Sequence, residues 1–227
     1  MHIEPGVVEG SKMTLSYATA AGSAGLALAM ALKTIRDDGG LIALALRSVF
    51  TTGFVLIFFQ VLPHYPVGVS EVHFIFGATL YLVFGAGPTA LGLAAGLFLQ
   101  GYIFEPSDLP QYFINVTSLI VPLWLVTLVA KRLIARNTPY VGLKSWQVLA
   151  MSGSFQGSII VCVILWSVYG QGFGAENMAA IGAFATSYLL VIIVEPIVAL
   201  IILAIAKKLD PSIRNPIFYN RLHHPVV

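Results

Sequence analysis

Charged side chains are scarce in this sequence. Lys, Arg, Asp and Glu make up 10% of its 227 residues, whereas soluble domains carry about 25%. Hydrophobic residues make up 58%, and the mean hydropathy is +0.88. Several apolar runs continue for about 20 residues without a charge, which is the length that crosses a bilayer. The composition therefore excludes an ordinary soluble domain and predicts an integral membrane protein.

Cysteine and the common catalytic motifs are also missing or nearly so. Cys162 is the only cysteine, which excludes an internal disulfide and a metal cluster built from cysteines. We expect it to pack as a small apolar residue. The sequence contains neither the P-loop pattern GxxxxGK[ST] nor the HExxH pattern. It shows no convincing internal repeat, so an inverted-repeat carrier gains no support.

Apolar runs separated by turn residues predict an all-α membrane protein, a compact bundle of about seven transmembrane helices. Helices are expected because backbone groups inside lipid must be paired within the segment. Two of the runs hold only about 16 residues and barely cross the hydrocarbon. These two form either a tight spanning hairpin or a re-entrant one, with both ends on the same side. The seven candidate segments are 13–35, 41–62, 71–86 and 88–104 (the two short ones), 112–134, 145–169 and 177–206.

Basic residues predict the orientation. If the N-terminus lies outside, Lys12 is the only Lys or Arg on the outer side, and the others face the cytoplasm. Loops rich in Lys and Arg stay inside, so we expect an odd number of crossings, a cytoplasmic C-terminus and a place in the inner (plasma) membrane.

Residues 1–12 do not resemble an export signal, because they lack a basic start. The expected organisation is an extracytoplasmic metal-binding segment at 1–12, a bundle at 13–209 and a cytoplasmic tail at 210–227.

The first two residues offer three nitrogen donors to a metal ion. The α-amine of Met1, the amide nitrogen of His2 and the Nδ1 of His2 close a five-membered and a six-membered chelate ring. The three nitrogens are nearly coplanar, which suits Ni(II) or Cu(II), is within reach of Co(II), and suits zinc less well. A histidine in second place should also protect the start methionine from removal. Taken alone, however, a histidine at position 2 is accidental in most proteins.

A fourth donor is expected from a histidine on the outer side. We favour His73, which we expect to begin a short apolar helix, and we regard His64 as a spare or outer-shell group. The competing interpretation is that His73 is simply a polar residue at the membrane interface.

Three other polar residues lie inside apolar segments. Glu195 is expected near mid-membrane, where an acid is costly and often functional. It can gate the metal path, carry a proton, or, in its protonated form, hydrogen-bond between helices. Gln100 and Asn115 either line the metal pocket or hydrogen-bond across helices.

The start MHI-x-x-G and the stretch from Val69 to Pro122 resemble the CbiM/NikM family, the substrate-binding membrane subunits of cobalt and nickel energy-coupling-factor ABC transporters. The matching positions are His73, Gly87-Pro88, Gln100, Phe104 and Asn115, together with Glu195 near the end of the chain.

The resemblance implies a metal held by four nitrogens, which here belong to Met1, His2 and His73, with Gln100 and Asn115 supporting the N-terminal loop. The chain departs from the family pattern where Glu71-Val72-His73 replaces the usual Ser-Gly-His, and where Val7-Val8 replaces an aromatic residue followed by Leu.

The expected function is therefore uptake of Co(II) or Ni(II) as transported substrate, without enzymatic activity. The expected partners are an energy-coupling transmembrane subunit, ATPase subunits and a small accessory membrane subunit; no nucleic-acid partner is expected. The alternatives are a metal-dependent intramembrane enzyme, which would use Glu195, and a non-transporting receptor or assembly protein.

Overall fold

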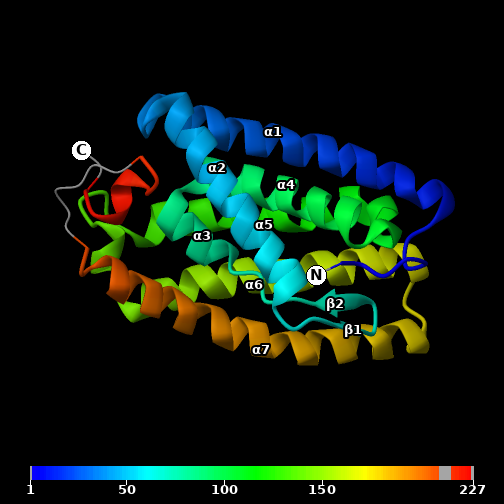
Figure 1. Cartoon of the computed structure of the whole chain (residues 1–227). Helices are drawn as coiled ribbons and strands as arrows, with labels where there is room; N and C mark the ends of the chain where they lie inside the picture. The colour runs from blue at the N-terminus through cyan, green and yellow to red at the C-terminus, as the bar shows by residue number, and fades with distance from the viewer. Residues whose placement is uncertain (1, 210–215, 226–227) are drawn as a thin grey trace.

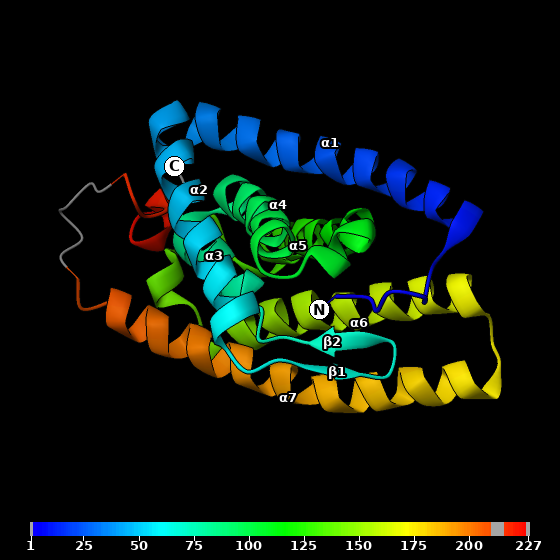
Figure 2. The same ribbon diagram turned by 45° about the vertical axis from the view of Figure 1, so that its right-hand side comes forward.

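The computed structural model describes residues 2–209 and 216–225. In this part of the chain, seven α-helices form a bundle, and a two-stranded antiparallel sheet lies against it (Figure 1). In Figure 2, α4 and α5 lie between α1 on one side and α6 and α7 on the other. The elements are α1 (Met13–Asp37), α2 (Gly40–Leu56), β1 (Tyr65–Val67), β2 (Ser70–Val72), α3 (Gly77–Phe84), α4 (Ala86–Ile103), α5 (Tyr112–Leu133), α6 (Ser145–Gln171) and α7 (Ala175–Ala206).

Five helical stretches of the described chain are long and apolar enough to cross a membrane. Large hydrophobic side chains such as Leu190, Ile197 and Ile205 of α7 are exposed on the outside of the bundle. Lipid rather than water is the solvent that such a surface needs. The protein is thus a multi-pass membrane protein, as its composition predicts. The five stretches are Gly10–Asp37, Gly40–Val61, Pro106–Leu133, Ser145–Gln171 and Ala175–Ala206.

The expectation of one continuous helix over 71–86 is wrong. The segment begins in β2, continues as a non-helical linker over 73–76, and becomes helical only in α3. The eight residues of α3 span about 12 Å, well short of a bilayer core. The carboxylate of Glu195 accepts hydrogen bonds from the backbone N–H groups of Ala78 (2.8 Å) and Thr79 (3.3 Å). A partner at the first N–H groups of α3 allows the helix to begin inside the bundle.

Small residues let α2 and α4 approach closely. A Cβ at Gly92 would collide with Thr51, and a Cβ at Gly96 would collide with Val55. The Thr51 hydroxyl also donates to the carbonyl of Pro88, with 2.8 Å between the oxygens. Packing of this kind is how membrane helices associate in the absence of a hydrophobic force between them.

The C-terminal segment folds against one end of the bundle. Asp38, between α1 and α2, forms an ion pair with the buried Arg47. Its Oδ1 also accepts a hydrogen bond from the backbone N–H of Asn220, with 3.2 Å between the oxygen and the nitrogen. The Arg47 Nε donates to the carbonyl of Pro216 (2.8 Å). The backbone N–H of Tyr219 donates to the carbonyl of Val83 at the end of α3 (2.8 Å). Residues 2–12, the described part of the metal-binding segment proposed at 1–12, lie toward the opposite end, beside β2 and the start of α5 (Figure 1).

Candidate metal site

The N-terminal segment returns to the bundle and pairs with β2. Ile3 forms an antiparallel bridge with Ser70, and the N–H of Glu71 donates to the carbonyl of His2 over 2.8 Å. The Ser70 hydroxyl donates to the same carbonyl, with 2.7 Å between the oxygens. The N-terminal segment thus adds an edge strand to the small sheet, and this pairing fixes the position of the His2 side chain.

Two further contacts hold this segment against α5 and the turn before it. Ile3 is 1% exposed, and its N–H donates to Oδ1 of Asn115 over 3.0 Å. Gln111 donates from Nε2 to the carbonyl of Val8 over 3.2 Å. Between them the chain turns at Pro5-Gly6, where Gly6 adopts a φ of 93° that other residues seldom adopt. Side chains distant in sequence therefore hold the N-terminal strand in place.

The structure brings His2, His73 and His64 together. The rings of His2 and His73 lie edge to face with centroids 4.9 Å apart, and both contact Phe59. His2 is 1% exposed and His73 is fully buried. His64 stacks on His73 with the same centroid separation and an angle of 6° between the rings. His73 lies in the linker before α3, so its expected place at the start of a helix is wrong.

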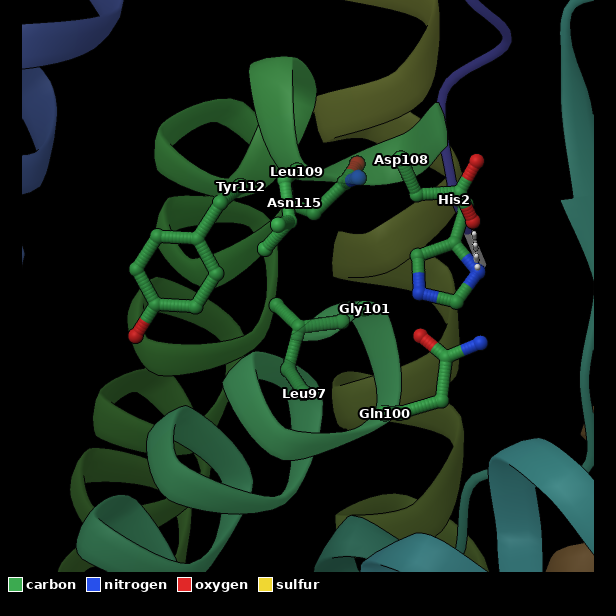
Figure 3. Close-up of a pocket in the computed structure, with 8 residues that line it drawn as sticks. All are labelled: His2, Leu97, Gln100, Gly101, Asp108, Leu109, Tyr112 and Asn115. Atoms are coloured by element: carbon green, nitrogen blue, oxygen red, sulfur yellow. Dashed lines mark ion pairs between the residues drawn. The ribbon is translucent and has the colours of Figure 1, made fainter. Parts of the chain in front are cut away.

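Glu71 lies between the two imidazoles. Its Oε2 is 3.0 Å from Nδ1 of His2 and 3.4 Å from Nε2 of His73. One ligand atom from each of the three residues lies within 4.8 Å of the other two. Asp108 places Oδ2 3.5 Å from the same Nδ1 of His2 (Figure 3). The sequence interpretation did not assign Glu71 or Asp108 to the site. The signal for Glu71 was its two-residue spacing from His73, which puts both on one face of an extended chain.

His2 and His73 are neutral at physiological pH. Burial lowers the pKa of His2 to about 4, although the hydrogen bond to Glu71 opposes this shift. Burial also holds the pKa of His73 well below its ordinary value. Burial would raise the pKa of Glu71, but the hydrogen bond from His2 and the surrounding electrostatic field together outweigh burial and lower that pKa. The cluster thus presents two uncharged imidazoles and one carboxylate, the protonation states in which these groups bind metals.

A small pocket opens beside His2, with about 170 Å³ of empty space, part of it open to solvent. In Figure 3, the Gln100 amide points toward the imidazole of His2, and Asn115 lies on the other side of the pocket. Three buried polar atoms have no hydrogen-bond partner among the described residues: Nε2 of His2, Oε1 of Gln100 and Nδ2 of Asn115. Buried polar atoms of this kind usually find a partner, so the pocket has unused capacity for a polar ligand or water.

Two expected site residues, Met1 and Glu195, are not among the described residues of this cluster. Met1 lies outside the described residues, so the role of its amine stays a prediction. Glu195 is not part of the pocket. Its other oxygen accepts a hydrogen bond from Nε2 of Gln156 (2.7 Å), which also donates to the carbonyl of Ile75 in the linker after His73 (2.6 Å). The environment of Glu195 is thus a network that holds α3 and the linker.

No curated protein sequence and no solved structure gives a significant match to the chain. The CbiM family, described as the cobalt uptake substrate-specific transmembrane region, matches residues 2–213. This range begins at the buried His2 and includes every side chain of the cluster described above. The chain therefore belongs to the CbiM family of transmembrane components of cobalt uptake.

Proposed function

We propose that the protein captures a divalent transition-metal ion, Co(II) or Ni(II), between the N-terminal strand and the linker before α3, and delivers it across the membrane. The donors are the amine of Met1, the amide nitrogen and Nδ1 of His2, and the imidazole of His73. The proposal rests above all on one observation: two buried, neutral imidazoles lie 4.9 Å apart, although their positions in the sequence differ by 71 residues.

The surroundings of His2 suit a metal bound at Nδ1. In the metal-free protein, Nδ1 carries the proton that it donates to Glu71. A metal ion on Nδ1 moves the ring proton to Nε2, because a neutral imidazole carries one. Nε2 has no partner among the described residues, and Gln100 points toward this ring from the same pocket (Figure 3). Oε1 of Gln100 can then accept a hydrogen bond from the Nε2–H group and fix the ring, as partners of metal-bound histidines commonly do.

Asn115 and Ser70 have a different role in this proposal. They hold the N-terminal strand against α5 and β2 through hydrogen bonds to Ile3 and to the carbonyl of His2. The donors of the first two residues are therefore positioned before the ion arrives. Pre-positioning of this kind removes part of the entropy cost of binding.

The proposed topology places the metal site at the outer face and the C-terminal segment in the cytoplasm. The five long stretches, α4 and the broken segment from β2 to α3 then make seven crossings. Irregular backbone at membrane depth is tolerated where protein buries it, and the part of the linker that follows His73 fits this description. Release inward requires that the linker and the N-terminal strand separate. We propose that ATPase subunits drive this step through an energy-coupling transmembrane subunit, with a small accessory membrane subunit completing the assembly.

Metal binding by the purified full-length protein tests the proposal. The wild type should bind one Co(II) or Ni(II) per chain, and His2→Gln and His73→Ala should each lose stoichiometric binding. Gln rather than Ala is chosen at position 2, because a small residue there would also promote removal of Met1. His224→Ala is the matched control, since His224 is exposed in the C-terminal segment. Retention of full binding by both site variants would contradict the proposal.

A further inference from the structure

We propose that Glu71 is a ligand of the transported ion, and that its carboxylate makes the site selective for Co(II) over Ni(II). This inference depends on the proposed function, because it concerns the ion bound by His2 and His73. It adds an oxygen donor to a set otherwise built from nitrogens.

The distances around Glu71 fit one shared ion. Ligand atoms about 2.1 Å from a metal and separated by 90° to 109° lie roughly 3.0 to 3.4 Å from one another. Oε2 of Glu71 is 3.0 Å from Nδ1 of His2 and 3.4 Å from Nε2 of His73. The carboxylate oxygen is thus as far from each imidazole nitrogen as two ligands of one ion are.

The backbone holds Glu71 in this position. Its N–H donates to the carbonyl of His2 over 2.8 Å, and its neighbour Ser70 donates from its hydroxyl to the same carbonyl. The side chains of Glu71 and His73 share one face of the extended chain because they are two residues apart. The carboxylate therefore reaches the cluster from a paired strand and not from a mobile loop.

Charge also favours a carboxylate ligand. Among the four nitrogen donors only the deprotonated amide nitrogen of His2 carries a negative charge, so a divalent ion in this buried site would keep an uncompensated positive charge, which is costly. Glu71 supplies a negative charge in contact with both rings. A second acid close to His2 is Asp108, whose Oδ2 is 3.5 Å from Nδ1 of His2. Asp108 comes from the turn before α5, and it lies farther from His2 than Glu71 does.

An oxygen donor changes which ion suits the site. Four nitrogens in a plane favour Ni(II) and Cu(II), whereas a carboxylate added as a fifth donor suits an ion that accepts higher coordination and mixed donors. Co(II) accepts five or six ligands of this kind. Because Ni(II) binds more tightly than Co(II) to most nitrogen and oxygen sites, preference for cobalt must come from geometry and donor type. Glu71 provides both.

Competition between the two ions is the first test. Purified full-length wild type, Glu71→Gln and Glu71→Ser are titrated with Co(II) in the presence of Ni(II). Both variants should lose Co(II) preference by a factor on the order of 10 to 100 and should show altered visible absorption bands of bound Co(II). Glu176→Gln, which removes an exposed acid at the start of α7, should behave as wild type. Unchanged preference and unchanged bands in both Glu71 variants would overturn the inference and leave the proposed function standing.

A second measurement needs no variant and so does not depend on variant folding. Wild-type protein labelled with ¹³C-glutamate is compared by infrared spectroscopy with and without Co(II). Ligation by Glu71 should shift a labelled carboxylate stretching band, and where Glu71→Gln folds, this shift should be absent from it. A bound ion without any shifted glutamate band would overturn the inference alone. A wild type that binds neither ion would instead overturn the proposed function, and the inference with it.

Discussion

The side chain of Asn115 accepts a hydrogen bond from the backbone N–H of Ile3, with 3.0 Å between Oδ1 and the nitrogen. Both residues are buried, so water does not replace this bond when it is lost. The contact links α5 to the strand that carries His2, and it touches none of the proposed metal donors. A variant that loses this contact therefore tests how the N-terminal strand is positioned, while all proposed metal donors stay in place.

Replacing Asn115 with Leu should weaken metal binding without removing a ligand. Loss of the Ile3 contact frees the N-terminal strand, and we expect affinity for Co(II) to fall by a factor on the order of 10 to 100 at unchanged stoichiometry. Isothermal titration calorimetry of the purified variant measures both quantities. Asn137→Ala, at an exposed position between α5 and α6, is the control and should keep wild-type affinity. Wild-type affinity in Asn115→Leu would show that Asn115 does not position the strand.

The metal-free protein should lose stability as the pH falls from about 6.5 to about 4. His2 has a pKa of about 4 in the folded protein because it is buried, against 6.5 as its ordinary value. Between these values the unfolded chain binds more protons than the folded chain, so stability rises with pH through this window. The contribution of His2 to the free energy of unfolding is roughly 3 kcal/mol across the window. Thermal unfolding of the metal-free protein measured at several pH values tests this.

The variant His2→Gln provides the comparison for the pH series. It should unfold with a smaller pH dependence than the wild type, and the part that remains belongs to groups such as His73, whose pKa is also lowered. Equal pH dependence in the two proteins would contradict the assignment of this effect to His2.

Glu195 should act through structure and not as a proton carrier. Glu195→Ala removes the acceptor for the N–H groups of Ala78 and Thr79 and for the amide of Gln156. Each buried group left without a partner costs about 1 to 3 kcal/mol, so the unfolding temperature should fall clearly. Glu195→Gln keeps one oxygen acceptor, so its unfolding temperature should fall less than that of Glu195→Ala. Thermal unfolding and cobalt uptake by cells are measured for both variants.

The uptake result decides between the two interpretations of Glu195. If the residue only anchors α3 and the linker, uptake should decline in proportion to the loss of folded protein. A Glu195→Gln variant that is stable and binds Co(II) normally, yet transports none, would instead show a role in gating or proton transfer.

The sequence alone predicted the long helices and the proximity of His2 and His73. Hydropathy identifies α1, α2, α5, α6 and α7 because each is an apolar run of sufficient length, bounded by turn residues. The juxtaposition of His2 and His73 followed from donor chemistry and from the family resemblance, and the structure places their rings in contact. Metal binding by the two residues stays a prediction.

The sequence did not reveal the strand and linker that precede α3. Residues 71–86 read as one apolar run, and apolar runs of this length have no signal that separates strand from helix. The strand exists because it pairs with β1 and with residues 2–4. The helix begins late because Glu195, more than a hundred residues away, binds its first N–H groups. Glu71 was missed for the same reason, since only the extended conformation puts it on the same face as His73.

The close packing of α2 against α4 should make Gly96 intolerant of even a methyl group. In Gly96→Ala, the new Cβ would meet the side chain of Val55 and approach the carbonyl of Thr52, so α4 must move away from α2. Overpacking of this kind costs about 1 to 3 kcal/mol. Gly22→Ala is the matched control: a Cβ at Gly22 in α1 meets nothing within 4 Å, and alanine favours the helix by roughly 0.5 to 1 kcal/mol. The unfolding temperature should therefore fall in Gly96→Ala and rise slightly in Gly22→Ala. A Gly96→Ala protein as stable as wild type would contradict the described packing.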